Sequence, residues 1–387
     1  MRHISDDERR ARIARRHGID PARRHTDAVS ATGAMTVLHA TEPPSVHLAL
    51  RARVDGLTTA DGDRALYEER SLVKQLAMRR TLFVFPADLL PAAWGSASAR
   101  VAHTQWKRVS KDVEAAGLAD DGEGWLKRAG DAVLARLAEG AATAAELRQD
   151  VPEIAGTVTM GAGKTWGGTT PIAPRVLTVL GARGDIVRGR NTGHWRVSRP
   201  EWTLMSRWLD DVPDPLPARE GYAQIVRRYL WTFGPVTTAD LQWWLGSTKT
   251  AAVHALADVA AVEVEVSTGP AWVLPDDVDP VAPVEPWAAL LPILDPTVMG
   301  WKERDFFLGA HGPQLFDRNG NAGTTAWWDG RVVGCHVQEE DGVVRLRLIE
   351  DVGSDGRAAL EHEADRLTTW LDGQRVSTVY PSPLMRA

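Results

Sequence analysis

The strongest constraint on the fold is a succession of amphipathic segments in the middle of the chain. Three segments have the apolar spacing or the capping pattern of helices, and they are followed by two segments with the alternation of strands. The predicted helices span 125–137, start at Thr143 and span 174–182, and the predicted strands span 185–189 and 194–197 around a turn at 190–193.

The same succession occurs a second time. Its helices are predicted at 222–233, from Thr238 and at 249–256, and its strands at 262–266 and 271–274. Helix, capped helix, helix and hairpin is the order of a winged helix-turn-helix unit, a fold common among DNA-binding proteins. We predict a first, more distorted copy over 27–85, with 82–85 as its wing strand. Proline-rich joints at 210–217 and 275–286 separate the later parts of the chain.

The chain ends in a region with a different pattern. Strands are predicted at 324–328, 331–338 and 343–350, with tight turns at Asp329-Gly330 and Asp341-Gly342 and one long helix at 356–372. This predicts a small, mostly antiparallel barrel or sheet with a helix across it. The predicted class is therefore α+β, mainly helical, with three tandem winged helix-turn-helix units and a C-terminal β-rich, barrel-like domain. The predicted domains are 1–120, 121–212, 213–283 and 284–387.

Composition excludes several classes of protein. A chain of 387 residues at ordinary hydrophobicity can bury several cores. The single cysteine, Cys335, excludes an intramolecular disulfide and a cysteine-cluster zinc site, and the scattered histidines do not suggest another metal site. No apolar run approaches the roughly 20 residues of a membrane helix, and the arginine-rich N-terminus lacks a following apolar segment. We expect a cytoplasmic protein, monomeric and without contact with membranes.

The formal net charge of -6 is unfavourable for a DNA-binding protein, because duplex affinity comes largely from lysine and arginine. The distribution of arginines weakens this objection. They concentrate in the first 24 residues and again at Arg51, Arg53, Arg79 and Arg80. A local basic face is one interpretation, and a solvated helix surface is the more common one.

A short segment at 38–44 contains the residues most able to perform chemistry. It places an imidazole (His39), a hydroxyl (Thr41) and a carboxylate (Glu42) within four residues, just before Pro43 and Pro44. Prolines cannot continue the hydrogen bonding of a helix, so we expect a helix to end here. The alternative is structural: a histidine at a helix C-terminus often only interacts with the helix dipole, and Glu42 would then be a solvated turn residue.

The segment and its surroundings resemble the catalytic motif of the AlkZ-like winged-helix DNA glycosylases, bacterial enzymes that remove alkylated bases. In that family the corresponding positions read Gln-x-Gln or Gln-x-Asp, whereas this chain has His39-Ala40-Thr41. The likeness spans most of the chain and is fairly specific for the superfamily, less so for a substrate. Its further pieces are at 64–67, 76–86, 290–296, 300–305 and 329–334.

The resemblance implies a monofunctional glycosylase that hydrolyses the N-glycosidic bond of N7- or N3-alkylated purines in double-stranded DNA, without a cofactor or metal. It would serve base excision repair or genotoxin resistance, near the nucleoid. His39 would position the water and accept its proton, and Thr41 would supply a second hydrogen bond. Glu42 would orient His39 or stabilise the developing cation.

Seven residues are expected to contact DNA. A loop at 161–165 resembles a phosphate-binding loop, but that motif would require glycine at Val158 and a preceding strand, so only a phosphate contact from Lys164 is expected. Trp301 could stack in an opened duplex. The more common role of a tryptophan, packing in a core, is the alternative. The expected contacts are Arg51, Arg79, Arg80, Lys164, Trp301, Lys302 and Arg304.

Two other functions remain open. Replacement of both family glutamines favours a non-catalytic DNA-binding protein, such as a lesion sensor or a regulator. The net charge and the scarcity of base-reading side chains in the predicted third helices favour a scaffold that does not bind DNA.

Overall fold

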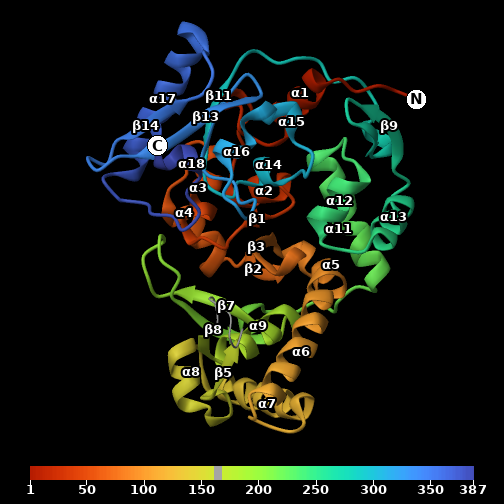
Figure 1. The fold of residues 1–387 in the computed structure, drawn as a ribbon, viewed down its shortest axis with the longest axis vertical. Coiled ribbons are helices and arrows are strands. Elements are labelled where there is room, and N and C mark those ends of the chain that lie inside the picture. Colours follow the sequence, from red (N-terminus) through yellow and green to blue (C-terminus); the bar gives the residue numbers. More distant parts are fainter. Residues whose placement is uncertain (161–167) are drawn as a thin grey trace. The chain divides into compact units, whose positions relative to one another are not determined.

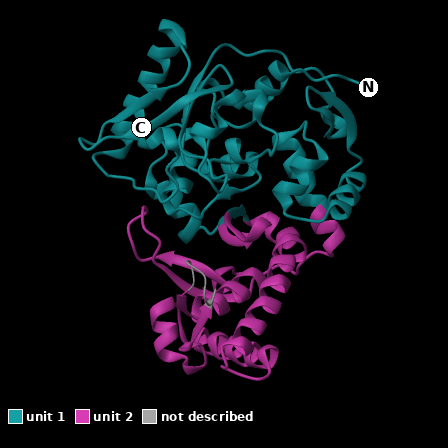
Figure 2. Ribbon diagram, viewed as in Figure 1, with its two compact units in different colours: residues 1–72, 84–86, 223–387 teal, residues 73–83, 87–222 magenta. Residues whose placement is uncertain are grey.

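The computed structural model describes residues 1–160 and 168–387 and contains two compact units. Unit 1 comprises residues 1–72, 84–86 and 223–387, and unit 2 comprises residues 73–83 and 87–222 (Figure 2). The fold is mixed α+β, about half helical, with several small antiparallel sheets. Among the described residues, no helix is both long enough and apolar enough to cross a membrane.

Unit 1 begins with the elements that carry the His39 segment (Figure 1). They are α1 (Asp6–Arg16), α2 (Ala28–Ala34), β1 (Leu38–His39), α3 (Pro43–Arg53), α4 (Thr59–Asp63) and the π-helical turn η2 (Arg64–Glu68).

The middle of unit 1 contains the second predicted succession of helices and strands. The predicted order is confirmed, and the capping box that opens α12 is formed by Thr237 and Asp240. Residues 2–4 run alongside β9, where Ile4 N donates to Glu265 O at 2.8 Å. The elements are α11 (Ala218–Phe233), α12 (Thr238–Leu245), α13 (Lys249–Asp258), β9 (Val262–Val266) and β10 (Gly269–Val273).

The last part of unit 1 is an antiparallel sheet in the order β11-β12-β13-β14 with α17 packed against it. The edge strands β11 and β14 do not pair with each other, so the described residues form an open sheet and the barrel-like prediction was wrong. Four strands are too few to close around a filled interior, and α17 covers the sheet instead. The strands are β11 (Ala288–Leu291), β12 (Thr325–Trp328), β13 (Arg331–Gln338) and β14 (Val344–Leu348), and the helices are α14 (Pro296–Met299), α15 (Asp305–Leu308), α16 (Gly312–Leu315), α17 (Gly353–Leu371) and α18 (Pro383–Arg386).

Unit 2 contains the first predicted succession, and its helices are confirmed. Thr143 caps α8 with the predicted box to Glu146, and apolar side chains of α6, α7 and α9 form one core, with Val109, Val133 and Val176 at its centre. The helices are α5 (Leu90–Gly95), α6 (Ala97–Ala115), α7 (Gly122–Glu139), α8 (Ala144–Asp150), α9 (Ala173–Arg183) and α10 (Met205–Trp208). The strands are β4 (Ala142–Thr143), β5 (Thr157–Met160), β6 (Gly168–Pro171), β7 (Ile186–Asn191) and β8 (Pro200–Leu204).

Two local predictions in unit 2 were wrong. The second strand of the hairpin begins at Pro200 rather than at His194, because the Asn191 side chain holds the intervening loop through Gly193 O and Val197 O. The segment before 161 is a strand, β5, which had not been expected. It pairs antiparallel with β6. The loop at 161–165 itself lies outside the described residues.

Strands β2 (Leu72–Ala77) and β3 (Thr81–Pro86) form a hairpin, and β3 includes the predicted strand at 82–85. The sheet order is β1-β3-β2. The four domain boundaries stay a prediction, because compact units do not measure which segments fold independently.

Candidate functional site

The His39 segment is a strand that leads into a helix. His39 lies in β1 and is 5% exposed, Thr41 is exposed, and Glu42 is the residue before α3. The two prolines begin α3 rather than ending a helix, so that prediction was wrong. The reason is that proline, with its fixed φ and missing N–H, suits the first helical position, where no partner for that N–H exists.

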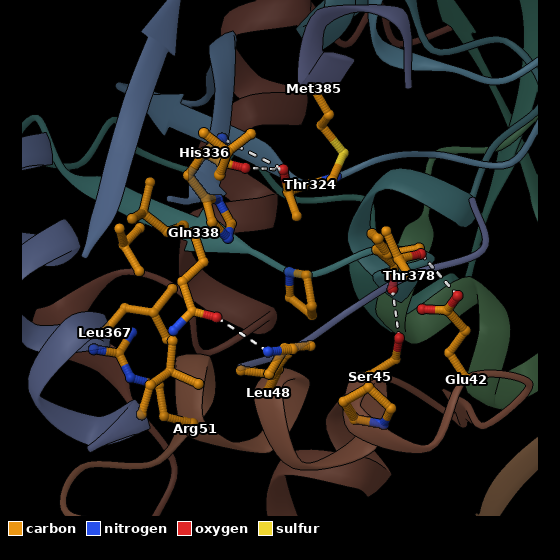
Figure 3. A pocket seen from close by; sticks show the side chains of 18 residues that line it. Glu42, Ser45, Leu48, Arg51, Thr324, His336, Gln338, Leu367, Thr378 and Met385 are labelled. Atoms are coloured by element: carbon orange, nitrogen blue, oxygen red, sulfur yellow. Dashed lines mark hydrogen bonds between the residues drawn. The ribbon is translucent and has the colours of Figure 1, made fainter. Parts of the chain in front are cut away.

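Glu42 is 7% exposed and bound to the C-terminal segment of unit 1. Its Oε1 accepts hydrogen bonds from Thr378 Oγ1 at 2.7 Å and from Val379 N at 2.8 Å (Figure 3). Burial raises the pKa of this carboxyl, and the two hydrogen bonds oppose that rise. The contacts give Glu42 a tethering role. It joins the turn between β1 and α3 (residues 40–42), which we call the corner, to residues 378–379.

Two contacts fix α3 to the segment that follows β11. At the start of the helix, Ser45 Oγ donates to Ile293 O at 2.9 Å. At its end, the fully buried Arg53 forms a bidentate pair with Asp295, with Nη1–Oδ2 at 2.8 Å and Nη2–Oδ1 at 2.7 Å. Planar paired hydrogen bonds of this kind define both distance and orientation. The residues at 290–296, which resembled the family in sequence, therefore hold the helix that carries the corner.

A buried hydrogen-bonded chain extends from Arg53. Its Nη2 donates to Thr297 Oγ1 at 2.9 Å, Thr297 lies 3.0 Å from His17 Nδ1, and His17 Nε2 lies 3.0 Å from Thr232 O. A carbonyl can only accept, so Nε2 carries the proton and Nδ1 accepts from Thr297. Burial lowers the pKa of His17 to about 3, so the imidazole is neutral.

A cavity of about 80 Å³ adjoins the start of α3. Its walls come from α3, β13, α17 and the C-terminal segment, and most of them are apolar (Figure 3). His336, whose pKa burial lowers to about 4, and Gln338 are among the polar side chains that line it. Glu42 and its partner Thr378 both line this cavity, so the tether forms part of the cavity wall.

Two of the predicted DNA contacts, Arg51 and Trp301, are buried. Arg51 is buried and lies 3.7 Å from Glu363, and burial lowers its pKa to about 10. Trp301 is 3% exposed, donates to Phe233 O and packs edge-on to Phe306. The environments of both side chains are those of packing residues, and for Trp301 this is the alternative that the sequence left open.

The loop after Trp301 is anchored by the capping box of α12. Asp240 Oδ1 accepts from Lys302 N at 2.7 Å and from Glu303 N at 2.8 Å, so one buried carboxylate serves both the helix and the loop. Lys302 itself is exposed. Arg304 lies over the Phe316 ring at 4.5 Å, so its guanidinium is partly occupied by an aromatic contact.

Arg79 and Arg80 form the tip of the β2–β3 hairpin, both with positive φ. Arg80 is exposed and Arg79 is half-buried. Lys164 lies outside the described residues.

The N-terminal arginines do not form a basic surface. Arg12 is buried between Glu8 and Asp277, Arg16 pairs with Asp277, and Arg9 lies 3.5 Å from the Phe306 ring centroid. Both predictions from this run, a DNA-binding face or a solvated face, were therefore wrong for these three side chains. The neighbouring Asp6 and Glu8 and the distant Asp277 neutralise them.

Sequence reasoning missed the role of the residues that hold α3, namely Arg53 and Asp295; it placed Arg53 in a possible basic face, whereas the structure buries it fully. One signal could have identified them: each is a charged residue within an apolar run, and a buried charge requires a partner. The tether from Thr378 has no comparable signal in the sequence.

Within residues 1–160 and 168–387, no three histidine, cysteine, aspartate or glutamate side chains form a group that could hold a metal ion. In fold the chain is similar to the Streptomyces sahachiroi DNA glycosylase AlkZ, with a TM-score of 0.74 at 20% identity over 95% of this chain and 98% of that chain. No curated protein sequence matches it significantly. A family model described as DNA glycosylase AlkZ-like matches residues 32–370, and the chain therefore belongs to the AlkZ-like DNA glycosylase family.

Proposed function

We propose that this protein is a monofunctional DNA glycosylase that hydrolyses the N-glycosidic bond of N7- or N3-alkylated purines in double-stranded DNA. The observation that carries the proposal is the position of His39 and Thr41 at the entry of α3, a helix fixed at both ends by Ser45 and Arg53. A catalytic group must be held by a rigid support to position a water molecule.

In the proposed mechanism the departing base needs little help. An N7- or N3-alkylated purine is already cationic, so it leaves as a neutral base without receiving a proton. The developing oxocarbenium ion is then attacked by water. His39 orients this water and accepts its proton, and the Thr41 hydroxyl supplies the second hydrogen bond.

Glu42 acts in this proposal as a positioning residue. Its carboxylate is engaged by Thr378 and Val379, which supports a role in holding the corner rather than in touching the sugar. No lysine lies near His39 in the sequence, Lys74 being the first, so the mechanism includes no Schiff base with the sugar.

Three tandem winged helix-turn-helix units would supply the surface for the duplex. The observed order of α7, α8, α9 and the β7–β8 hairpin supports one unit, and α11, α12, α13 and the β9–β10 hairpin support another. The third is proposed for the segment from α2 to β3. We propose that the protein acts as a cytoplasmic, nucleoid-associated monomer in base excision repair or genotoxin resistance.

The decisive experiment is base release from a duplex that contains 7-methylguanine. His39→Ala should slow excision by roughly 100-fold to 10,000-fold, the usual loss when a general base is removed, with duplex affinity nearly unchanged. His362→Ala, which removes an exposed histidine of α17, outside the proposed winged-helix units, is the matched control and should retain full activity.

Full activity of His39→Ala would refute this mechanism. If the intact protein releases no alkylated base but binds the duplex, the lesion sensor or regulator is the better function. That second function is favoured by one observation, the replacement of both family glutamines by His39 and Thr41.

A further inference from the structure

The segment from Arg70 to Lys111 is strongly basic in an acidic protein. It contains eight lysine and arginine residues and a single acidic residue, Asp88, although the whole chain has 51 acidic residues and a net charge of -6. The segment includes the β2–β3 hairpin and most of α6.

The cationic side chains of α6 lie on its exposed face. Val109 and Val113 point into the core of unit 2, and the residues on the opposite side of the helix repeat at intervals of three and four. Five exposed residues make up what we call the basic face of α6, namely Arg100, His103, Lys107, Arg108 and Lys111.

The hairpin tip adjoins this helix within unit 2. Residues 78–80 pack against α6, and Arg80 Nη1 donates to Gln105 Oε1 at 3.4 Å. Arg79 and Arg80 have φ of 55° and 59°, a conformation that two-residue hairpin turns usually assign to asparagine and glycine. Non-glycine residues rarely adopt this conformation, and those that do concentrate at functional sites. Two arginines therefore occupy a turn that disfavours them, beside a helix that is already basic.

Few acidic groups neutralise the basic face. Among the described residues, no ion pair holds Lys107 or Lys111, and Arg108 lies 4.0 Å from Asp112, which is also paired with Arg175. The two units also differ in charge. Unit 2 has 20 lysine and arginine residues against 17 aspartate and glutamate residues, a net charge of +3, which leaves -9 for unit 1.

We infer that the basic face of α6, together with Arg79 and Arg80, binds the phosphate backbone of duplex DNA outside the lesion. The inference rests on the proposed function and extends it, because it assigns the surface that holds undamaged duplex. At a rise of 1.5 Å per residue the face is about 16 Å long, which matches about five phosphates along one strand. Lysine and arginine contacts of this kind are independent of base sequence.

The test measures binding separately from chemistry. Fluorescence anisotropy with an undamaged duplex gives the dissociation constant at several salt concentrations, and base release from a 7-methylguanine duplex is measured in parallel. The test variant is Lys107→Gln/Lys111→Gln. The control is Arg357→Gln/Arg386→Gln, which removes the same charge from exposed positions of α17 and α18, outside the proposed DNA-binding surfaces.

We expect the test variant to bind more weakly to every sequence and to reduce the slope of log affinity against log salt by about one for each lysine. The control should change little, and Lys107→Arg/Lys111→Arg should bind like the wild-type protein. Equal effects of test and control variants would overturn the inference, as would wild-type protein that binds no duplex. If no base is released while the slope still depends on Lys107 and Lys111, the proposed glycosylase function fails and this inference stands.

Discussion

At the residue scale, the buried ionisable groups of unit 1 determine how firmly the corner is held. Arg53 and Asp295 are both fully buried, and each satisfies the other with two hydrogen bonds. Removal of one partner from such a pair leaves an uncompensated charge, which typically costs 3–5 kcal/mol. The same arginine orients Thr297, and through it His17.

The neutral state of His17 makes the stability of unit 1 depend on pH. Its pKa is about 3 in the folded protein and near 6.5 when exposed, so between these values the unfolded chain binds more protons. Stability is then fully present above about pH 6.5 and is lost progressively as the pH falls towards 3. His336, lowered to about 4, contributes in the same direction.

We predict that His17→Gln flattens this dependence. Glutamine can donate to Thr232 O and accept from Thr297, but it does not titrate. Urea unfolding at pH 7 and pH 5 gives the free energy of unfolding of the wild-type protein and of the variant. This free energy should fall less between the two pH values in the variant, and the fall that remains should come from groups such as His336. An unchanged loss between the two pH values would show that His17 is not protonated on unfolding.

At the element scale, the β2–β3 hairpin combines an unfavourable turn with favourable surroundings. Its strands are largely buried, with Phe83 and Phe85 among the core residues, yet its tip contains Arg79 and Arg80 at positive φ. An asparagine-glycine pair would fit this turn without strain. Arginine at both positions therefore lowers the stability of the turn and adds two positive charges.

The substitution Arg79→Asn/Arg80→Gly should consequently stabilise the protein by about 1 kcal/mol and weaken duplex binding. Arg79→Lys/Arg80→Lys retains both the charge and the strain, so it should change neither property greatly. Urea unfolding and anisotropy with an undamaged duplex measure the two effects. A variant that gains stability without losing affinity would remove the hairpin tip from the DNA-binding surface.

At the scale of the whole molecule, the net charge of -6 conceals an uneven distribution. Most arginines of unit 1 form ion pairs within the protein, such as Arg12 with Glu8 and Arg51 with Glu363. Lys302 differs from these because it is exposed on a loop that Asp240 anchors. Affinity for a duplex should therefore depend on a few exposed cations, and each of them should add about one to the slope of log affinity against log salt.

Lys302→Gln should lower the salt slope by about one and weaken binding to two unrelated duplexes by the same factor. Arg357→Gln, at an exposed position of α17 outside the proposed winged-helix units, serves as the control for loss of one charge. Arg304→Ala is a less direct probe, since it also removes packing against Phe316. Loss of binding to only one of the two duplexes would indicate base reading by Lys302 and contradict this prediction.

The sequence alone determined the elements whose signals are local. The capping box at Thr143, the start of α12 to within one residue, the apolar periodicity of α7, α9 and α11, and three of the four strands of the C-terminal sheet could be read directly, whereas β11 was missed. These signals depend on hydrogen bonds and side-chain spacing within one turn or one hairpin. The family resemblance could likewise be found from short segments.

Tertiary structure decided what those elements contact. The helix that Pro43 starts, α3, is held by Ile293 and Asp295, which lie 248 and 242 residues away in the sequence from their partners Ser45 and Arg53. The same kind of distant contact buries Trp301 against Phe233 and binds Glu42 to Thr378. The free energy of such contacts depends on which surfaces meet, and no local pattern records this. The sequence therefore determined which residues could form a site, and long-range packing decided which of them are held in place.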